Sequence, residues 1–420
     1  MSGPTARPDD GATAGGHGAP PAPAGGLGAL SSLRVVELGV WVAAPATAAL
    51  LADWGADVIK VEPPTGDPMR NVFGSLGIGD EMPNPAFALD NRGKRSVVLD
   101  LRDDTARARL EELLATADVF ISNLRPDALD KLGLEPEATV ARHPHLVYCS
   151  VSGYGLHGDD RNRPTYDIGA FWARSGLASQ MADAEGNPLN ARGGIGDHIT
   201  GLAALSGVLA AVLEQRHTGR GRVVEVSLLR TGTYVLGWDL GIQMALGRVA
   251  GSEPRHRNQA PLMNPYRTAD GRWFFFTGLE AARHIPAVCR ALDRPDLLDD
   301  PRFTDATAIR RHRTEVIAVL DEIIAERPLA EWAARFEAEG VWWAPAQTPA
   351  DVVADPQLAA NDGFVELAGG GLRSVNGPVT FSDVRAAPGV GVPALGEHTD
   401  EVLAELAARA SDTAQAGHAP

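Results

Sequence analysis

Residues 33–62 read LRVVELGVWVAAPATAALLADWGADVIKVE and predict the start of an α/β fold. The apolar, β-branched runs at 33–38 and 57–62 predict two strands, and the alanine- and leucine-rich run at 45–55 predicts a helix between them. A strand, a helix and a second strand at this spacing form a βαβ unit. Its two strands are expected to be parallel, with a right-handed crossover.

The same alternation continues along the chain. Further strands and helices are expected at 94–101, 105–117, 118–124, 146–153, 199–215 and 223–229. This pattern predicts a doubly wound, Rossmann-like α/β domain, in which ligands bind at the carboxyl ends of the strands. The first strand-to-helix loop, GVWVAAP at 39–45, lacks the G-x-G-x-x-G pattern, which argues against a dinucleotide-dependent enzyme. Trp41 is the aromatic residue of interest, because it lies in this loop.

The pattern changes after the last of these strands, where a hairpin-like stretch at 264–278 lies among helical segments. This change predicts a second, smaller α+β domain. The expected segments are a disordered leader at 1–27, a large α/β domain at 28–225, a small domain at 226–335, a return to the large domain at 336–410 and a flexible tail at 411–420.

The composition is that of a globular chain, since 44% of its 420 residues are hydrophobic and 22% are charged. The net charge of −16 argues against nucleic acid or an anionic membrane as the main partner, although a local basic cluster can still bind a small anion. Cys149 and Cys289 show no metal-ligand or disulfide spacing, so we expect a cytoplasmic protein. We also expect no membrane span, secretory signal or transit peptide.

An acidic residue stands at the start of an apolar helical run in RGGIGDHITG at 192–201. Asp197 is a favoured residue type for capping a helix, where its oxygen accepts backbone N–H groups of the first turn. However, Gly193, Gly194 and Gly196 also let the backbone approach a ligand closely, and a reactive carboxylate needs that access. The residues themselves leave both roles open.

Basic side chains in the first predicted domain form a candidate anion site. They are Lys94, Arg95, Arg125 and Lys131. The ends of neighbouring strands converge in an α/β sheet, so these residues could surround one anionic ligand. Ordinary solvated surface charge is the alternative.

Other catalytic motifs give no support. The histidines show no metal-ligand spacing, and His198 does not face Asp197, because neighbouring positions on a helix point in different directions. We therefore predict no metal site. No G-x-S-x-G or Walker sequence occurs, which argues against a serine hydrolase or a P-loop NTPase.

An ordered set of motifs resembles the class III CoA-transferases of the CaiB/BaiF type, which include formyl-CoA transferase, carnitine CoA-transferase and α-methylacyl-CoA racemase. The likeness begins in the stretch quoted above and continues through NRGKRSVVLDLR, ADVFISNLRPDALDKLG, SVSGYG, PTYDIGAFWARSG, GGIGDHITG, TGRGRVVEVSLL, DPQL and GEHTDEVL. It spans about 33–403 in the same order, and such a set is far more specific than any one motif.

The resemblance implies that Asp197 is catalytic, because the family's nucleophilic aspartate occupies the same G-D step before a small-residue helix. In the family, this carboxylate attacks the acyl-CoA carbonyl and gives a mixed anhydride and CoA thiolate. CoA then forms an aspartyl-CoA thioester, from which the acceptor carboxylate takes the CoA. The implied substrates are an acyl-CoA thioester and a free carboxylic acid, with no tightly bound cofactor.

The family's CoA contacts carry over to the first-strand loop and to the loops that follow. Together with Arg95 from the basic set, these residues are Val42, Ala43, Asn91, Lys94, Asn123, Leu124, Arg125, Lys131, Tyr166 and Asp167. The cations would hold the diphosphate and the 3′-phosphate. Formyl-CoA transferase has a basic residue where Pro63 stands, so one phosphate contact of the family is missing or replaced here.

Alternatives remain for the activity and for the assembly. The racemase branch of the family moves an α-proton with a histidine and an aspartate, and Tyr166 stands where that histidine would be. Tyrosine is a poor base at neutral pH, so transfer is favoured. A non-catalytic CoA-binding subunit is the other alternative, and the presence of Asp197 argues against it. The family also implies an interlocked homodimer, with a heteromer formed with a paralogue as the alternative.

Overall fold

The computed structural model describes residues 28–75, 77, 84–183, 185–251, 253–368, 372–382 and 391–416. The expected leader at 1–27 and residues 417–420 of the expected tail lie outside these ranges. Packing divides the chain into two compact units. Among the described residues, the large unit comprises those up to Asp167, Gly193–Thr231 and those from Asp362 onward, and the small unit comprises those within Ile168–Arg192 and Gly232–Asn361.

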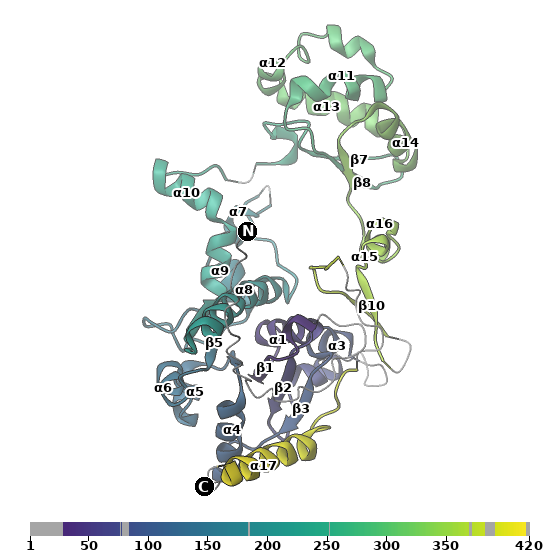
Figure 1. Cartoon of the computed structure of the whole chain (residues 1–420). Helices are drawn as coiled ribbons and strands as arrows, with labels where there is room; N and C mark the ends of the chain where they lie inside the picture. Colours follow the sequence, from purple (N-terminus) through teal and green to yellow (C-terminus); the bar gives the residue numbers. More distant parts are fainter. Residues whose placement is uncertain are drawn as a thin grey trace, which may run out of the picture. The chain divides into compact units, whose positions relative to one another are not determined.

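A six-stranded parallel sheet forms the centre of the large unit (Figure 1). In sheet order, its strands are β3 (Arg95–Val98), β2 (Asp57–Glu62), β1 (Arg34–Leu38), β4 (Val119–Ser122), β5 (Val147–Ser152) and β6 (Val223–Ser227). Each strand pairs in parallel with its neighbours. The two halves wind outward from β1 and β4, which is the order of a doubly wound fold. The predicted α/β class with a parallel sheet is therefore confirmed.

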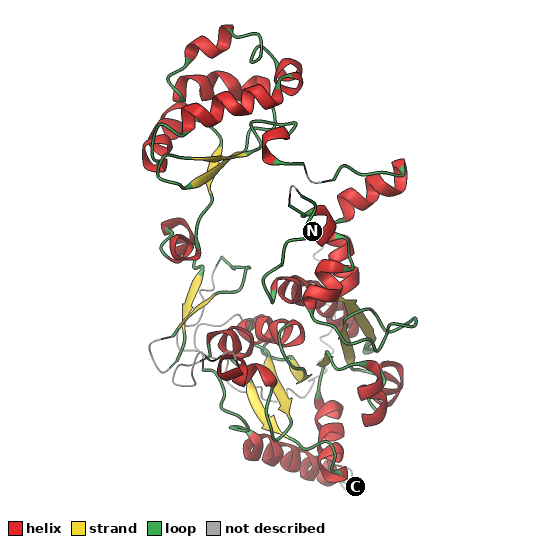
Figure 2. Ribbon diagram, turned by 180° about the vertical axis from the view of Figure 1, so that it is seen from behind, coloured by secondary structure: helices red, strands yellow, loops and turns green. Residues whose placement is uncertain are grey.

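Helices cover both faces of this sheet (Figure 2). The helices of the large unit include α1 (Ala43–Asp53), α2 (Val72–Ser75), α3 (Pro85–Asn91), α4 (Asp104–Thr116), α5 (Pro126–Leu132), α6 (Pro136–Arg142), α8 (Ile195–Thr218) and α17 (Thr399–Ala416). Val35 and Val58 lie on the face that packs with α1 and α8. Val36 and Ile59 lie on the face that packs with α4 and α17. Burial on both faces explains why the strands read as continuous apolar runs.

The end of the chain returns to the large unit. Helix α17 packs beside β3 (Figure 1), and it extends to Ala416, into the expected tail at 411–420. The compact units also differ from the expected segments at two places, because 168–192 belongs to the small unit and the return begins at Asp362. As domain limits, the bounds given in the sequence analysis stay predictions.

By length and composition, α8 is a candidate membrane span, contrary to the sequence expectation. It has 24 residues and a mean hydropathy of 1.5 in its most apolar window. However, Thr200, Ala204 and Val208 are buried, and the helix packs on α1 and on β5 and β6. The apolar composition of α8 is therefore accounted for by its place in the core.

The small unit contains a three-stranded antiparallel sheet of β7 (Pro265–Arg267), β8 (Trp273–Phe276) and β9 (Trp343–Pro345). Its helices include α7 (Leu177–Gln180), α10 (Gly237–Leu246), α11 (Ala281–Ala291), α12 (Ala306–Arg311), α13 (Arg313–Ile324), α14 (Leu329–Glu339), α15 (Pro349–Val353) and α16 (Pro356–Ala360). The predicted hairpin at 264–278 is confirmed, since β7 and β8 pair antiparallel and Gly271 has a φ of 78° in the turn. Tyr266 and Phe274 anchor the core of this unit.

Four charged side chains form a buried network inside the large unit. Glu37 accepts hydrogen bonds from Lys60 Nζ (2.7 Å) and Lys94 Nζ (2.6 Å), and Lys60 Nζ also lies 3.0 Å from Asp67. All four side chains are inaccessible to solvent. Burial alone would raise the pKa of Glu37, but the two ammonium groups outweigh it and hold the pKa below its ordinary value. Loss of this carboxylate would leave two buried cations without their shared partner.

We predict that Glu37→Gln lowers the free energy of unfolding by about 3–5 kcal/mol, because it leaves buried charge uncompensated. Urea unfolding followed by circular dichroism measures the change. Glu112→Gln is the matched control, since Glu112 is an exposed acid that pairs with Arg109 on α4 at 2.7 Å. Its loss should change the free energy by less than about 1 kcal/mol. Equal losses in the two variants would contradict the structural role of Glu37.

Candidate active site

Asp167, and not Asp197, organises the turn that begins α8. Gly194 occupies the N-cap position with a φ of 88°, a left-handed conformation that favours glycine. The Asp167 carboxylate accepts hydrogen bonds from the backbone N–H groups of Gly194 (2.9 Å) and Gly196 (3.1 Å). Asp167 thus satisfies N–H groups of the kind that a capping side chain would bind. The capping role considered for Asp197 is therefore wrong.

Asp197 lies in the first turn of α8 with its carboxylate free. It is partly accessible and makes no hydrogen bond or ion pair with any described residue. Burial, reinforced by the negative charge of Asp167, raises the pKa of Asp197 to about 7. Poor solvation and an unused pair of oxygens make this carboxylate more basic and more reactive than an exposed one.

The next residue, His198, contacts a buried carboxylate from α3. Its Nε2 lies 3.0 Å from Asp90 Oδ1, and its Nδ1 lies 2.8 Å from the carbonyl oxygen of Gly194. The Asp90 side chain is 4% exposed and the His198 side chain 43% exposed. The hydrogen bond to Asp90 raises the pKa of His198 above its ordinary value, although burial opposes the shift.

Close packing of α8 on α1 determines the direction of Asp197. Thr47 Oγ1 lies 3.1 Å from the carbonyl oxygen of Gly201, and a Cβ atom at Gly201 would come within 3.1 Å of the Ala43 carbonyl oxygen. Asp197 precedes Gly201 by about one helical turn, so the two residues lie on the same side of α8. The carboxylate is therefore on the side of α8 that packs on α1.

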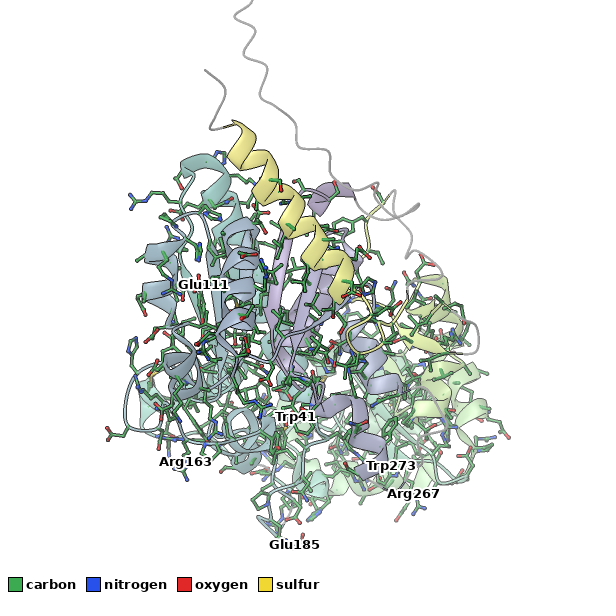
Figure 3. The ribbon with its side chains drawn as sticks, turned by 90° about the horizontal axis from the view of Figure 1, so that it is seen from below. Trp41, Glu111, Arg163, Glu185, Arg267 and Trp273 are labelled. Atoms are coloured by element: carbon green, nitrogen blue, oxygen red, sulfur yellow. The ribbon has the colours of Figure 1, made fainter. Side chains whose placement is uncertain are left out.

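Two polar side chains, those of Asn123 and Asp67, hydrogen-bond to the backbone of the loop between β1 and α1. Asn123, which follows β4, accepts from Val40 N (2.9 Å) and donates to Val40 O (2.7 Å). Trp41 lies beyond the end of β1 (Figure 3) with a φ of 66°, which is uncommon for a residue other than glycine. Its N–H donates to Asp67 (3.1 Å), and its ring meets that of Tyr166 edge-on at 5.7 Å between centroids. The loop that precedes Val42 and Ala43 is thus fixed beside the segment that holds the α8 turn.

Two of the predicted cations are exposed at the ligand edge of the sheet. Arg125 directly precedes α5, and Lys131 lies in its last turn. Both are exposed, and neither forms an ion pair with another described residue. They follow β4, whose carboxyl end adjoins that of β1. Arg125 and Lys131, with Leu124 beside them, are therefore available to an anionic ligand.

Lys94 is not available in this way. Its Nζ is buried and lies within hydrogen-bond distance of Glu37 (2.6 Å), Asn91 Oδ1 (3.0 Å) and the Pro45 carbonyl oxygen (2.9 Å). These acceptors use all three donors of the ammonium group. Burial, opposed by Glu37, lowers the pKa of Lys94 to about 8. As a correction to the predicted site, Lys94 has no free donor for phosphate and Asn91 is fully buried, so both support the fold below the ligand edge.

Arg95 also has a structural role. It is the first residue of β3, so it lies at the amino end of its strand, away from the carboxyl ends where ligands bind. Its guanidinium pairs with Asp57 (2.8 Å) and with Glu405 of α17 (2.6 Å). We therefore remove Arg95 from the candidate site, because it attaches the C-terminal helix to the sheet.

Other ligand sites find little support. Within the described ranges, no group of three His, Cys, Asp or Glu side chains is arranged to hold a metal ion. The small unit has an open cavity of about 730 Å³ on β7 and β8, where Arg267 and Trp273 lie close together (Figure 3). Its two arginines are balanced by Asp270 and Asp321, so its charge favours no particular ligand.

Sequence reasoning missed the pairing of Asp90 with His198. The two residues are 108 positions apart, and neither belongs to a recognisable spacing. The only sequence signal was that His198 is adjacent to Asp197. That adjacency does not indicate a contact between His198 and Asp90. The role of Asp67 in holding Trp41 was missed for the same reason.

The sheet is doubly wound and lacks a dinucleotide loop, and at its ligand edge lie a carboxylate and two cations that have no partner among the described residues. This is the arrangement of an α/β enzyme that takes an anionic ligand. Comparison with known proteins specifies the class further. The chain belongs to CoA-transferase family III, whose family model matches residues 30–399.

Individual relatives agree with this family. The chain is 32% identical over 385 residues to (R)-2-hydroxy-4-methylpentanoate CoA-transferase of Clostridioides difficile, a match that covers 90% of this chain and 95% of that protein. It is also 32% identical over 386 residues to cinnamoyl-CoA:phenyllactate CoA-transferase of Clostridium sporogenes, covering 90% and 93%. A crystal structure of a CaiB/BaiF family protein from Brucella suis matches with a TM-score of 0.80 at 29% identity, covering 89% of this chain and 98% of that one. The expected family and the expected CoA-transferase activity are both confirmed.

Proposed function

We propose that the protein transfers CoA from an acyl-CoA thioester to a free carboxylic acid, with Asp197 as the covalent acyl acceptor. The observation that carries this proposal is the state of Asp197, a half-buried carboxylate without a partner among the described residues in the first turn of α8. Asp167 binds the backbone of that turn, which leaves Asp197 free for chemistry. Membership of CoA-transferase family III supports this type of reaction.

The proposed reaction divides one exchange into balanced steps. The Asp197 carboxylate attacks the thioester carbonyl, expels CoA thiolate and forms a mixed anhydride. The thiolate attacks the aspartyl carbonyl, releases the donor acid as a carboxylate and leaves an aspartyl-CoA thioester. The acceptor carboxylate then forms a second anhydride and frees the thiolate, which attacks the acceptor acyl carbon and regenerates Asp197. The raised pKa of Asp197, about 7, favours attack because a more basic carboxylate is a better nucleophile.

The proposed CoA site lies at the carboxyl ends of β1 and β4. Val42, Ala43, Leu124 and Tyr166 would contact the pantetheine and the nucleotide, and Arg125 and Lys131 would bind the phosphates. This division is supported by the exposure of both cations and by the general preference of α/β sheets for ligands at this edge. Asn123 and Asp167 would position the surrounding loops, since their side chains are engaged with backbone groups. No tightly bound cofactor is part of the proposal.

We predict that Asp197→Asn abolishes CoA exchange, because an amide cannot form the anhydride. The assay incubates the protein with acyl-CoA thioesters and free acids, including cinnamoyl-CoA, phenyllactate and (R)-2-hydroxy-4-methylpentanoate, and follows CoA exchange by mass spectrometry. Wild-type protein given acyl-CoA without acceptor should form an adduct that hydroxylamine traps at Asp197. Because burial raises the pKa of Asp197, the ionised carboxylate costs folding free energy near pH 7, so Asp197→Asn should be at least as stable as wild type. A variant that exchanges CoA at a normal rate, with deamidation excluded, would refute the covalent role.

We predict that Arg125→Ala and Lys131→Ala each raise KM for the acyl-CoA more than they lower kcat. A charge-assisted hydrogen bond to phosphate contributes about 1.5–3 kcal/mol, so each KM should rise at least about tenfold. Arg109→Ala is the control, because this exposed arginine lies on α4 and pairs with Glu112. Unchanged KM in both Arg125→Ala and Lys131→Ala would place the phosphates elsewhere.

We also propose that two copies of the chain form an interlocked homodimer. Helices α9 (Leu228–Val235) and α10 carry large apolar side chains that face solvent in the single chain. Tyr234 is 86% exposed, Trp238 84% and Met244 82%. An exposed apolar surface of this kind is typical of a protein interface. A second copy of the chain is its proposed occupant, since the family implies such a dimer.

Light scattering after size-exclusion chromatography should give the mass of a dimer that persists on extensive dilution, because linked chains cannot separate without unfolding. Trp238→Glu combined with Met244→Glu should reduce the yield of dimer. Leu298→Glu is the control, as an exposed apolar residue outside α9 and α10. A stable wild-type monomer would refute the dimer, and dimerisation only with a paralogue would support the heteromer.

The alternatives are less well supported by the site. Epimerisation needs a base at the α-carbon, but both ring nitrogens of His198 face acceptors, and tyrosine, the residue type at position 166, is generally a poor base. Absence of deuterium incorporation at the α-carbon in D₂O would separate transfer from epimerisation. A cytoplasmic location stays a proposal, consistent with Cys149 and Cys289 as buried free thiols.

A further inference from the structure

His198 is held between two hydrogen-bond acceptors. The Gly194 carbonyl oxygen, 2.8 Å from Nδ1, can only accept, so Nδ1 carries a proton. Asp90, 3.0 Å from Nε2, accepts from Nε2 when it is ionised. A ring placed between these two acceptors can donate from both nitrogens only as an imidazolium, and the pair is then a cation and an anion joined by a charge-assisted hydrogen bond.

A cation in this position is unusual. The first turn of a helix carries unsatisfied N–H groups and the positive end of the helix dipole, which favour acidic rather than basic side chains. His198 nevertheless lies there, and a buried carboxylate from a different helix is placed against it. The arrangement therefore has an electrostatic cost that another charge must offset.

The charged groups around this position are mostly acids. Asp197 directly precedes His198 on α8, Asp167 lies in the segment that binds the α8 turn, and Asp90 belongs to α3. Lys94, after α3, interacts with Asp90 but is saturated by its own buried partners. The first turn of α1 carries no titratable side chain. His198 is therefore a cation beside the carboxylates of Asp90 and Asp197.

We propose that the imidazolium of His198, held in place by Asp90, supplies a positive charge that keeps Asp197 ionised for attack on the acyl-CoA carbonyl. His198 acts here as a positioning residue through its charge, since helix neighbours do not face each other. This inference rests on the proposed role of Asp197 as nucleophile and adds the group that maintains its reactive form. Asp90 in turn fixes the protonation and the orientation of the ring.

The energetics agree with this assignment. Burial and Asp167 raise the pKa of Asp197 to about 7, His198 opposes them, and the effect of Asp90 is the smallest. The pair thus presents its positive end to Asp197. Without the imidazolium, the pKa of Asp197 would rise further, and a smaller fraction would be ionised at neutral pH. Because His198 is 43% exposed, solvent screening limits the expected shift to about one pKa unit.

The test compares pH profiles of kcat/KM for wild type and His198→Gln, with the substrate pair that exchanges fastest in the panel above. The acidic limb of the variant should move to higher pH by about one unit, so its activity below the limb falls about tenfold and recovers at alkaline pH. His217→Gln is the matched control, because this exposed histidine lies in the last turn of the same helix. Its profile should equal that of wild type.

A second substitution separates charge from structure. Adding Asp90→Asn to His198→Gln removes a carboxylate that raises the Asp197 pKa, so the acidic limb should move back toward wild type. A purely structural role predicts that the profile keeps its midpoint while the rate falls at every pH. If His198→Gln fails to fold, titration of ¹³C-labelled histidine in wild type is the substitute, with the His198 signal assigned from its displacement in Asp90→Asn, which keeps the ring. A His198 ring that titrates at or below its ordinary value of about 6.5 would overturn the inference.

The outcomes distinguish the two proposals. Activity in Asp197→Asn would overturn the nucleophile and this inference with it. An inactive Asp197→Asn together with a His198→Gln profile superimposable on wild type would overturn the role of His198 alone. Both proposals are supported if Asp197→Asn is inactive, if the acidic limb of His198→Gln moves to higher pH, and if adding Asp90→Asn moves that limb back toward wild type.

Discussion

The carboxylate of Glu37, shared by two buried lysines, is the interaction on which the rest of the site depends. Lys60 connects it to β2 and to Asp67, and Lys94 connects it to the start of α1 through the Pro45 carbonyl. Asp67 also holds the backbone of Trp41. The loop between β1 and α1 is thus anchored to charges in the interior, where low dielectric makes each contact strong and each loss costly. A rigid loop at this edge is what a ligand site on a parallel sheet requires.

Helix α8 packs closely on the start of α1 because a glycine, Gly201, lies at the contact. Gly201 lets the helix approach the backbone of α1 closely, and Asp167 binds the N–H groups that open the helix. As a result, Asp197 is neither needed as a cap nor solvated as a surface acid. Burial and the neighbouring Asp167 carboxylate raise its pKa, and the nearby His198 limits that rise. The reactivity proposed for Asp197 therefore comes from its surroundings more than from its residue type.

The basic residues show why charge alone is a weak guide to a binding site. Lys94, Arg95, Arg125 and Lys131 look equivalent in the sequence, and all four fitted an anion site. In the structure, Lys94 is enclosed by acceptors and Arg95 attaches α17, whereas Arg125 and Lys131 remain exposed. The difference depends on which acids approach from distant segments, and a side chain whose donors are already used has nothing to offer a phosphate.

The sequence by itself determined the strands and helices, the parallel sheet, the lack of a dinucleotide loop and the family, because hydrophobic period and ordered motifs are local properties of the chain. It also singled out Asp197, since an acid after glycines and before an apolar helix is visible in ten residues. Only the tertiary structure decided that Asp167 binds the α8 turn, that Asp90 holds His198, and which cations are free. Hydrogen bonds and ion pairs depend on distances of about 3 Å between atoms, and for Asp90 and His198 those atoms lie 108 residues apart along the chain. Distances across such separations are set by packing, which no local pattern records.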